Sequence, residues 1–566
     1  MEIVKAPTDP EKERGFFYII REQDIFTGEN DLANDGRGLS YFHQDAGRLI
    51  NSAEITGNVT DKKIKELLET VQGFKTLVHS MGVSIEMDNP STICEFEFQM
   101  YGKEDLYGGG AKLTCKLKGD GSEHRIYMSD INWTEDDNVP GQIKVFTPHP
   151  DMAGKVSVRL FLQDGFTAPE QINDNPVDVK SPEYKEMINR SLYQKGNPAR
   201  IQKLLKKARA GEDVYITYIG GSITQGAGAN PINTECYAYK SFVEIKYLLG
   251  DTDNIHFIKA GVGGTPSQLG MIRFERDIQR DGAVTPDLVV VEFAVNDEQD
   301  ETKGDCYESL VRKALNLPSR PAVILLFSVF ADDSNLQERL IPVGKRYDLP
   351  MVSVKNAVTP VFYERKDRIL SKHQYFYDMF HPTNLGHTIM ADCLVHAVCE
   401  ALNQKHVDDY DWKMDEAPAI GNTFEKVFLI DRKDNATYGK IELGDFTEVD
   451  DDLQAVELDA DLRQTPEFPH NWMYVGGDNN VFTIDLECKA LVIVFKDSGE
   501  VDAATAKAYV DGQFVRELDP YINRWRHCNP LILIKDQVTK KHHIEIKVDK
   551  DEIRNRFTIL GFGVVR

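Results

Sequence analysis

The middle of the chain alternates short apolar segments with segments of helical periodicity. The apolar segments are VYITYIG (214–220), IHFIKAG (255–261), DLVVVEFA (287–294), AVILLFSVF (322–330) and PMVSV (350–354). Helical patterns lie between them, at 239–249, 268–279 and 335–347. Nearly continuous apolar strands that alternate with helices are typical of a parallel sheet covered on both faces. We therefore predict an α/β domain with a parallel sheet over residues 184–404.

The segments before and after this domain follow a different pattern. Residues 90–167 and 415–566 alternate apolar and polar residues in short runs that Gly, Asp and Pro separate. The Asp-Gly pair at 511–512 is also a strong signal for a hairpin turn. Such alternation is typical of antiparallel sandwiches. We therefore predict a mixed β-sandwich domain over 1–175 and a jelly-roll-like β-sandwich over 415–566.

The first 80 residues are the least informative part of the chain. They contain one helical pattern, which spans 62–81. Three roles stay open for them: completing the adjacent sandwich, covering the active edge of the central sheet, or mediating self-association. The oligomeric state, a homo-oligomer included, stays open as well.

Composition and charge narrow the classes of function. The chain has 566 residues, enough for about three or four domains, and 41% of them are hydrophobic. Its net charge of −25 would repel a nucleic acid or an anionic membrane. The N-terminus lacks the apolar core of a signal peptide, and no segment reaches the ~18–20 continuous apolar residues of a membrane span. Eight cysteines without a CxxC pair favour reduced thiols. We expect a cytoplasmic protein without a nucleic-acid or membrane partner.

Polar residues collect at the expected strand ends of the central domain. The segments are GGSIT (220–224), AGVGG (260–264), AVND (294–297) and DMFHP (378–382), the last just before a helical pattern at 384–402. In parallel α/β sheets, ligands bind beyond the carboxyl ends of the strands. One edge of the sheet therefore carries a hydroxyl, a glycine turn, a carboxamide and an Asp/His pair.

These groups are the ones that ester cleavage requires. The hydroxyl of Ser222 becomes a nucleophile when a base takes its proton, and an imidazole such as that of His381 is the usual base for this step. Asp378 can fix the tautomer of that imidazole. The backbone N–H groups of Ser222 and Gly261 and the side-chain amide of Asn296 can donate to a tetrahedral oxyanion. We also expect that Gly261, without a Cβ, allows the substrate to approach closely.

The four segments resemble the Ser, Gly, Asn and His blocks of the SGNH (GDSL-like) hydrolase family, in the same chain order. The match extends from Val214 to about Leu402, and Gly221 stands where the family often has Asp. The resemblance implies a three-layer α/β/α core with a flavodoxin-like parallel sheet. It also implies a Ser222–His381–Asp378 triad and an oxyanion hole at Ser222, Gly261 and Asn296.

Other interpretations of these residues, and other chemistries, are less favoured. Asp297 and His387 are interpreted as structural. The chain has no GxSxG, HExxH or GxxxxGK[ST] motif, and its 14 histidines show no metal-ligand spacing. We therefore expect no metal and no organic cofactor.

The modular layout resembles that of carbohydrate O-acetyl esterases, which implies an acetylated oligosaccharide or polysaccharide such as xylan or mannan as substrate. The loop YINRWRH (521–527) suggests that Trp525 and Arg526 bind the glycan, and Trp472 is a second aromatic candidate. Two alternatives stay open. One is a small-ester, lipid or thioester hydrolase on the same triad, and the other is a catalytically silent glycan-binding protein.

Overall fold

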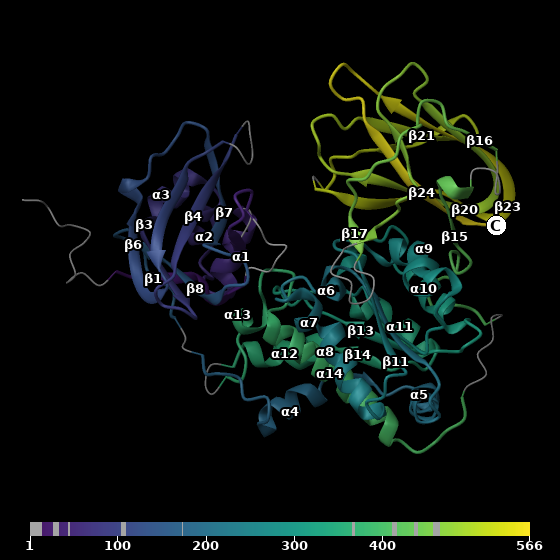
Figure 1. Ribbon diagram of the computed structural model, residues 1–566, viewed down its shortest axis with the longest axis horizontal. Helices are drawn as coiled ribbons and strands as arrows, with labels where there is room; N and C mark the ends of the chain where they lie inside the picture. The colour runs from purple at the N-terminus through teal and green to yellow at the C-terminus, as the bar shows by residue number, and fades with distance from the viewer. Residues whose placement is uncertain are drawn as a thin grey trace, which may run out of the picture. The chain divides into compact units, whose positions relative to one another are not determined.

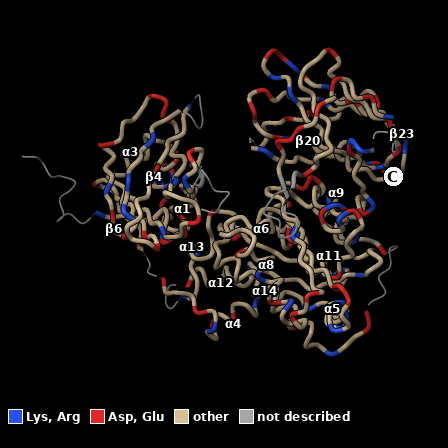
Figure 2. Tube along the Cα trace, viewed as in Figure 1, with Lys and Arg blue, Asp and Glu red and all other residues tan. Residues whose placement is uncertain are grey.

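The computed structural model describes residues 14–26, 33–42, 46–103, 109–171, 174–364, 368–409, 416–434, 440–456, 465–523 and 525–566. The chain forms two compact units. The first unit comprises Met1–Asp178, Phe330–Asp332 and Val361–Gly386, and the second comprises the rest of the chain. Acidic and basic residues are interspersed in both units (Figure 2).

The first unit contains two four-stranded antiparallel sheets, drawn in purple and blue in Figure 1. One sheet has the order β1 (Phe16–Phe26), β8 (Ala153–Leu162), β3 (Val78–Met87) and β6 (Asp120–Tyr127). The other has the order β2 (Gly38–Phe42), β7 (Asp137–Thr147), β4 (Ile93–Gly102) and β5 (Lys112–Lys118). Both sheets share one buried cluster with the helices α1 (Ala46–Ile55), α2 (Lys62–Leu68) and α3 (Val71–Leu77). Because β1 pairs with β8, residues 16–26 complete the sandwich.

The helical pattern expected at 62–81 is only partly present. It is divided into α2 and α3, because the Thr70 side chain accepts a hydrogen bond from the N–H of Gly73 and caps the second helix. Helix α3 ends at Leu77, and the residues from Val78 onward form β3. Pairing with β8 and β6 therefore outweighs the local helical periodicity at 78–81.

The second unit contains the expected parallel sheet. Its strands are β10 (Val214–Gly220), β11 (Ile255–Gly261), β12 (Leu288–Glu292), β13 (Ala322–Phe327), β14 (Met351–Ser353) and β9 (Leu192–Gln194). The spatial order is β11-β10-β12-β13-β14-β9, and all pairs are parallel except that of β14 with β9. This is the 2-1-3-4-5 order of flavodoxin-like sheets, with one added edge strand.

Helices follow or precede these strands, as the sequence predicted (Figure 1). They are α4 (Pro182–Asn189), α5 (Ala199–Arg209), α6 (Ser222–Gln225), α7 (Ile232–Glu235), α8 (Tyr237–Leu249), α9 (Ser267–Asp277), α10 (Asp305–Leu315), α11 (Gln337–Arg346), α12 (Val354–Phe362), α13 (Lys372–Tyr375) and α14 (Asn384–Asn403). Helix α14 is long and apolar enough to cross a membrane by length and composition. Its apolar residues such as Ile389, Leu394 and Val398 are buried within the fold, as in the core helix of a globular domain.

The C-terminal region forms an eight-stranded antiparallel sheet. Its strands are β15 (Phe428–Ile430), β16 (Lys440–Glu442), β19 (Trp472–Tyr474), β20 (Val481–Asp497), β21 (Thr505–Val510), β22 (Gln513–Leu518), β23 (His527–Asp549) and β24 (Phe557–Val565). A two-stranded sheet, β17 (Ala455–Val456) with β18 (Thr465–Pro466), lies apart from it. Strands β20 and β23 are long and continuous, and their pairing has a register shift between Cys488 and Ala490.

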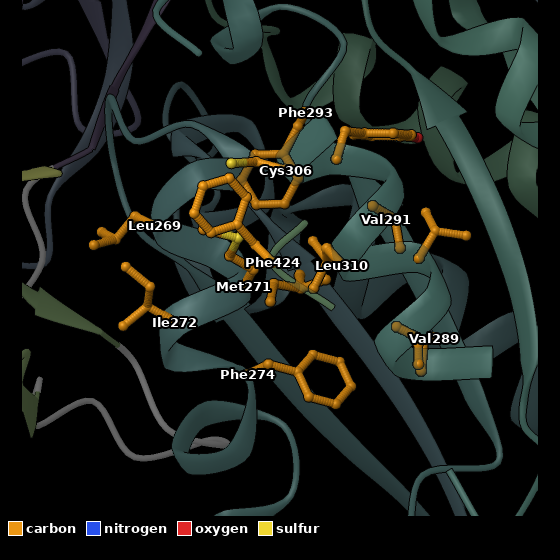
Figure 3. Packing of buried hydrophobic residues seen from close by; sticks show 14 of the residues in the cluster. Leu269, Met271, Ile272, Phe274, Val289, Val291, Phe293, Cys306, Leu310 and Phe424 are labelled. Carbon is orange, nitrogen blue, oxygen red and sulfur yellow. The ribbon is translucent and has the colours of Figure 1, made fainter. Parts of the chain in front are cut away.

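The C-terminal sheet and the parallel-sheet domain share one hydrophobic core. Figure 3 shows Leu269 and Ile272 of α9 packed with Phe424, which precedes β15. The same cluster includes Val492 of β20. The approach is close, since an ideal Cβ on Gly563 of β24 would lie 2.8 Å from Ile272 Cδ1. The C-terminal sheet is thus a fixed part of the second unit.

Candidate active site

Ser222 is the first residue of α6 and follows β10 through two glycines. An ideal Cβ on Gly220 would lie 2.1 Å from Thr224 Oγ1, and one on Gly221 would lie 2.1 Å from Asn296 Oδ1. The turn from strand to helix therefore has no room for side chains at these positions. It brings the carboxamide of Asn296 directly against the residue that precedes Ser222.

Gly261 ends β11 and pairs with Gly220 in the parallel register. An ideal Cβ on Gly261 would lie 2.0 Å from the backbone N of Gln225, the last residue of α6. The sequence argument assigned this glycine to close approach of the substrate. In the structure its missing side chain is required by the packing of α6 on β11. Two residues on, an ideal Cβ on Gly263 would lie 3.8 Å from Ser222 Cβ, so this glycine loop borders the serine.

Asn296 begins a short 3₁₀ turn (Asn296–Glu298) after β12. Its Oδ1 is buried and has no hydrogen-bond partner among the described residues. Buried polar atoms in native proteins are nearly always paired, so this oxygen is an exception, and the expected oxyanion donor is the amide nitrogen of the same side chain. Neighbouring Asp297 is structural, as predicted: it accepts hydrogen bonds from Ser267 N at 2.7 Å and Ser267 Oγ at 2.8 Å.

Asp378 and His381 form a tight turn in the first unit. His381 Nδ1 lies 2.9 Å from Asp378 Oδ2, and Asp378 Oδ1 accepts hydrogen bonds from the backbone N–H groups of Phe380 and His381, each at 2.8 Å. The carboxylate thus fixes the proton of the imidazole on Nδ1 and leaves Nε2 as the basic nitrogen. Ser222, Gly261 and Asn296 belong to the second unit.

Comparisons with known proteins match the domain that carries these residues. Residues 218–389 match the model of the GDSL-like lipase/acylhydrolase family. The central domain is a GDSL-like hydrolase domain. A search of curated proteins gave no match.

Two solved structures resemble a larger part of the chain. The crystal structure of a two-domain esterase active on acetylated mannans has 25% sequence identity and a TM-score of 0.58, covering 67% of this chain and 99% of that chain. The same esterase co-crystallised with mannopentaose has 25% identity and a TM-score of 0.57, covering 67% of this chain and 98% of that chain. With the family match, this similarity identifies the protein as a carboxylic ester hydrolase.

A buried polar network lies beneath the serine of the hydrolase domain. Glu292, at the end of β12, accepts hydrogen bonds from Thr224 Oγ1 at 3.1 Å and Ser328 Oγ at 2.8 Å. Thr224 also pairs with the Tyr237 hydroxyl at 2.8 Å, and burial raises the pKa of that phenol well above its usual value. His387 packs here as a structural residue, as predicted, with Nδ1 accepting from Tyr237 N at 3.2 Å. In the sequence, the sign of this network is Glu292, a carboxylate at the end of the otherwise apolar strand LVVVE.

Arg273 of α9 joins the two strands that lead to Ser222 and Gly261. It is 1% exposed, and its guanidinium donates to Gly220 O and Ala260 O, each at 2.9 Å, and to Asp277 Oδ2 at 2.8 Å. A buried guanidinium bonded to two strand-end carbonyls holds these ends in register. Sequence reasoning missed this residue, because an Arg/Asp pair four residues apart on a helix usually lies on the surface.

Residues of the C-terminal region contact the glycine loop 261–264. The ring of Trp525 lies against Gly264, where an ideal Cβ would be 2.8 Å from Trp525 Cζ2. His527 Nε2 pairs with Gly264 O at 3.0 Å. Gln454, which sequence reasoning missed, donates to Gly263 O at 2.6 Å and accepts from Cys528 N at 3.1 Å. The loop beside the serine is therefore fixed from outside the hydrolase domain.

The three residues suggested for glycan binding differ in their positions. Trp525 is 45% exposed beside the glycine loop, so its ring is accessible to a ligand. Arg526 forms an exposed ion pair with Asp452, and Arg524 of the same segment lies outside the described residues. Trp472 is fully buried among Phe482 and Phe562 in the core of the C-terminal sheet. The suggestion for Trp472 was wrong, because the hydrophobic effect places this indole in the core.

Proposed function

We propose that this protein is a serine esterase that removes O-acetyl groups from plant-type oligosaccharides or polysaccharides, with acetylated mannan favoured over xylan. The similarity to an esterase active on acetylated mannans carries this proposal, since it extends over 99% of that chain. The exposed indole of Trp525 beside the glycine loop supports a sugar substrate, because an aromatic face combined with polar neighbours suits a sugar ring.

In the proposed mechanism, Ser222 Oγ attacks the acetyl carbonyl carbon while His381 Nε2 takes the hydroxyl proton. Asp378 holds the resulting imidazolium. The N–H groups of Ser222 and Gly261 and the amide of Asn296 donate to the oxyanion. His381 then gives its proton to the leaving sugar oxygen, and acetyl-Ser222 remains. A water attacks this ester, gives its proton to His381, and releases acetate as the proton returns to Ser222.

The test is acetate release from acetylated mannan and xylan oligosaccharides, with 4-nitrophenyl acetate in parallel. We expect wild type to cleave all of them and Ser222→Ala to lose activity by several orders of magnitude, about 10⁵-fold or more. An organophosphonate should label Ser222 with one equivalent. Cleavage of only the aryl ester would remove the glycan from the proposal and leave a small-ester hydrolase. A fully active Ser222→Ala would overturn the nucleophile.

A further inference from the structure

We propose that the N-terminal sandwich positions the acid–base turn 377–381, through one contact at Tyr377 and a second at Asp174. The inference rests on the proposed function, since it assigns this turn the base and its orienting acid. It gives the sandwich a role in the reaction rather than that of an independent module. Both contacts lie within the first unit.

The first contact is a hydrogen bond next to the catalytic turn. The Tyr377 hydroxyl donates to the backbone oxygen of Tyr41 on β2 at 2.5 Å. The backbone N–H of Tyr377 donates to His381 O at 2.8 Å and so closes the turn. One residue therefore bonds both the sandwich and the turn, and its chain neighbour is Asp378.

The second contact is a cluster of charges around Asp174, in the connector after β8. The side chain of Asp174 is 7% exposed. It pairs with Arg21 of β1 at 3.7 Å, with His373 Nε2 at 3.3 Å, and with Arg368. Next to it, Gln374 Nε2 donates to Asn175 O at 2.9 Å. The carboxylate thus joins a strand of the sandwich to the segment that enters the turn.

The chain between the two contacts is short and internally bonded. Ser371 and Gln374 form a capping box at the start of α13, and this helix ends at Tyr375. Thr383 Oγ1 donates to Gln374 O at 2.6 Å, and Phe376 and Pro382 form an antiparallel bridge that closes the base of the turn. A displacement of α13 would therefore also displace Asp378 and His381. Small errors in the position of a catalytic base lower the reaction rate strongly.

The main experiment compares Tyr377→Phe with wild type on 4-nitrophenyl acetate and on an oligosaccharide acetate. Tyr247→Phe is the matched control, because Tyr247 lies on α8 and is 71% exposed. We expect Tyr377→Phe to lower kcat about 10-fold on both substrates, with KM changed less than about 2-fold. The acidic limb of the kcat/KM profile should shift, because it reports the environment of His381. The control should match wild type in every respect.

Rates are expressed per active site, from the burst of organophosphonate labelling at Ser222. A purely structural role would reduce the number of sites and leave the rate per site and the pH profile unchanged, which would overturn the proposal. Asp174→Asn tests the second contact in the same way and should also lower kcat per site. If wild type itself is not labelled at Ser222, the proposed function fails and this inference fails with it. If wild type is labelled and Tyr377→Phe behaves as wild type, only the positioning role is wrong.

Discussion

The carboxylate of Asp378 lies 2.9 Å from His381 Nδ1 and accepts a hydrogen bond from the N–H of that nitrogen. An asparagine at 378 would present an N–H to the imidazole or leave it in the other tautomer. We expect Asp378→Asn to lower kcat by about 10³- to 10⁴-fold on any ester that wild type cleaves, with the fold retained. Initial rates and circular dichroism measure the two effects. Asp253→Asn, which changes an exposed residue of the second unit, is the control. Near-normal activity of Asp378→Asn would show that Asp378 is not the orienting acid.

The fold of the hydrolase domain was predictable because its sequence signals are local. The apolar runs at 214–220 and 255–261 became β10 and β11 with those bounds, and three of the four motifs lie at the ends of β10, β11 and β12, whereas residues 378–382 lie between α13 and α14. The sandwich completed by β1 was less predictable, since a strand pairing across more than a hundred residues leaves no periodic trace.

Residues that act over long sequence separations could not be found from the sequence. Gln454 is 191 residues from its partner Gly263, and nothing in its neighbourhood marks it as a residue of the site. Trp472 and Trp525 look alike as exposed aromatic candidates, and only the register of β19 against β24 places the first in the core. The sequence also does not show why residue 261 must be a glycine, because the backbone atoms that it contacts belong to α6.

Gly261→Ala should destabilise the protein. The added Cβ would lie 2.0 Å from Gln225 N, a backbone atom that cannot rotate away. We expect the free energy of unfolding to fall by about 1–3 kcal/mol, as for an overpacked core, together with a loss of kcat from the displaced oxyanion donor. Urea unfolding measures the stability. Gly263→Ala is the comparison for stability alone, because its closest contact is the flexible end of Gln225 at 3.0 Å, and an equal loss in both variants would contradict the packing argument.

Trp525→Ala should separate glycan esters from small esters. The exposed ring borders the glycine loop, so its removal takes apolar surface from a bound sugar and leaves the acyl group untouched. We expect KM for an acetylated mannan oligosaccharide to rise on the order of 10-fold, or ~1.4 kcal/mol, and KM for 4-nitrophenyl acetate to stay nearly constant. Phe514→Ala, which removes a 56% exposed ring from β22, is the control. An equal rise for both substrates would assign Trp525 to packing.

The buried His373 makes stability depend on pH in the acidic range. Burial lowers the pKa of His373 from 6.5 to about 4; the nearby Arg21 and Arg368 act in the same direction and Asp174 opposes them. The folded-state pKa is therefore below the unfolded value, and the unfolded chain binds a proton between pH 6.5 and 4 that the folded chain does not bind. Stability should accordingly fall as the pH drops through this range.

His373→Gln should flatten this acidic decline, as measured by urea unfolding of the full chain from pH 7 to pH 4. Glu467→Gln provides a comparison of opposite sign. Burial, and then neighbouring Asp277, raise the pKa of Glu467 to about 7, so the folded chain keeps a proton that the unfolded chain loses from about pH 4.5 upward. Glu467 therefore lowers the free energy of unfolding as the pH rises to 7. Glu467→Gln should steepen the rise of this free energy with pH. Identical pH profiles for wild type and His373→Gln would show that His373 contributes nothing to the acid sensitivity.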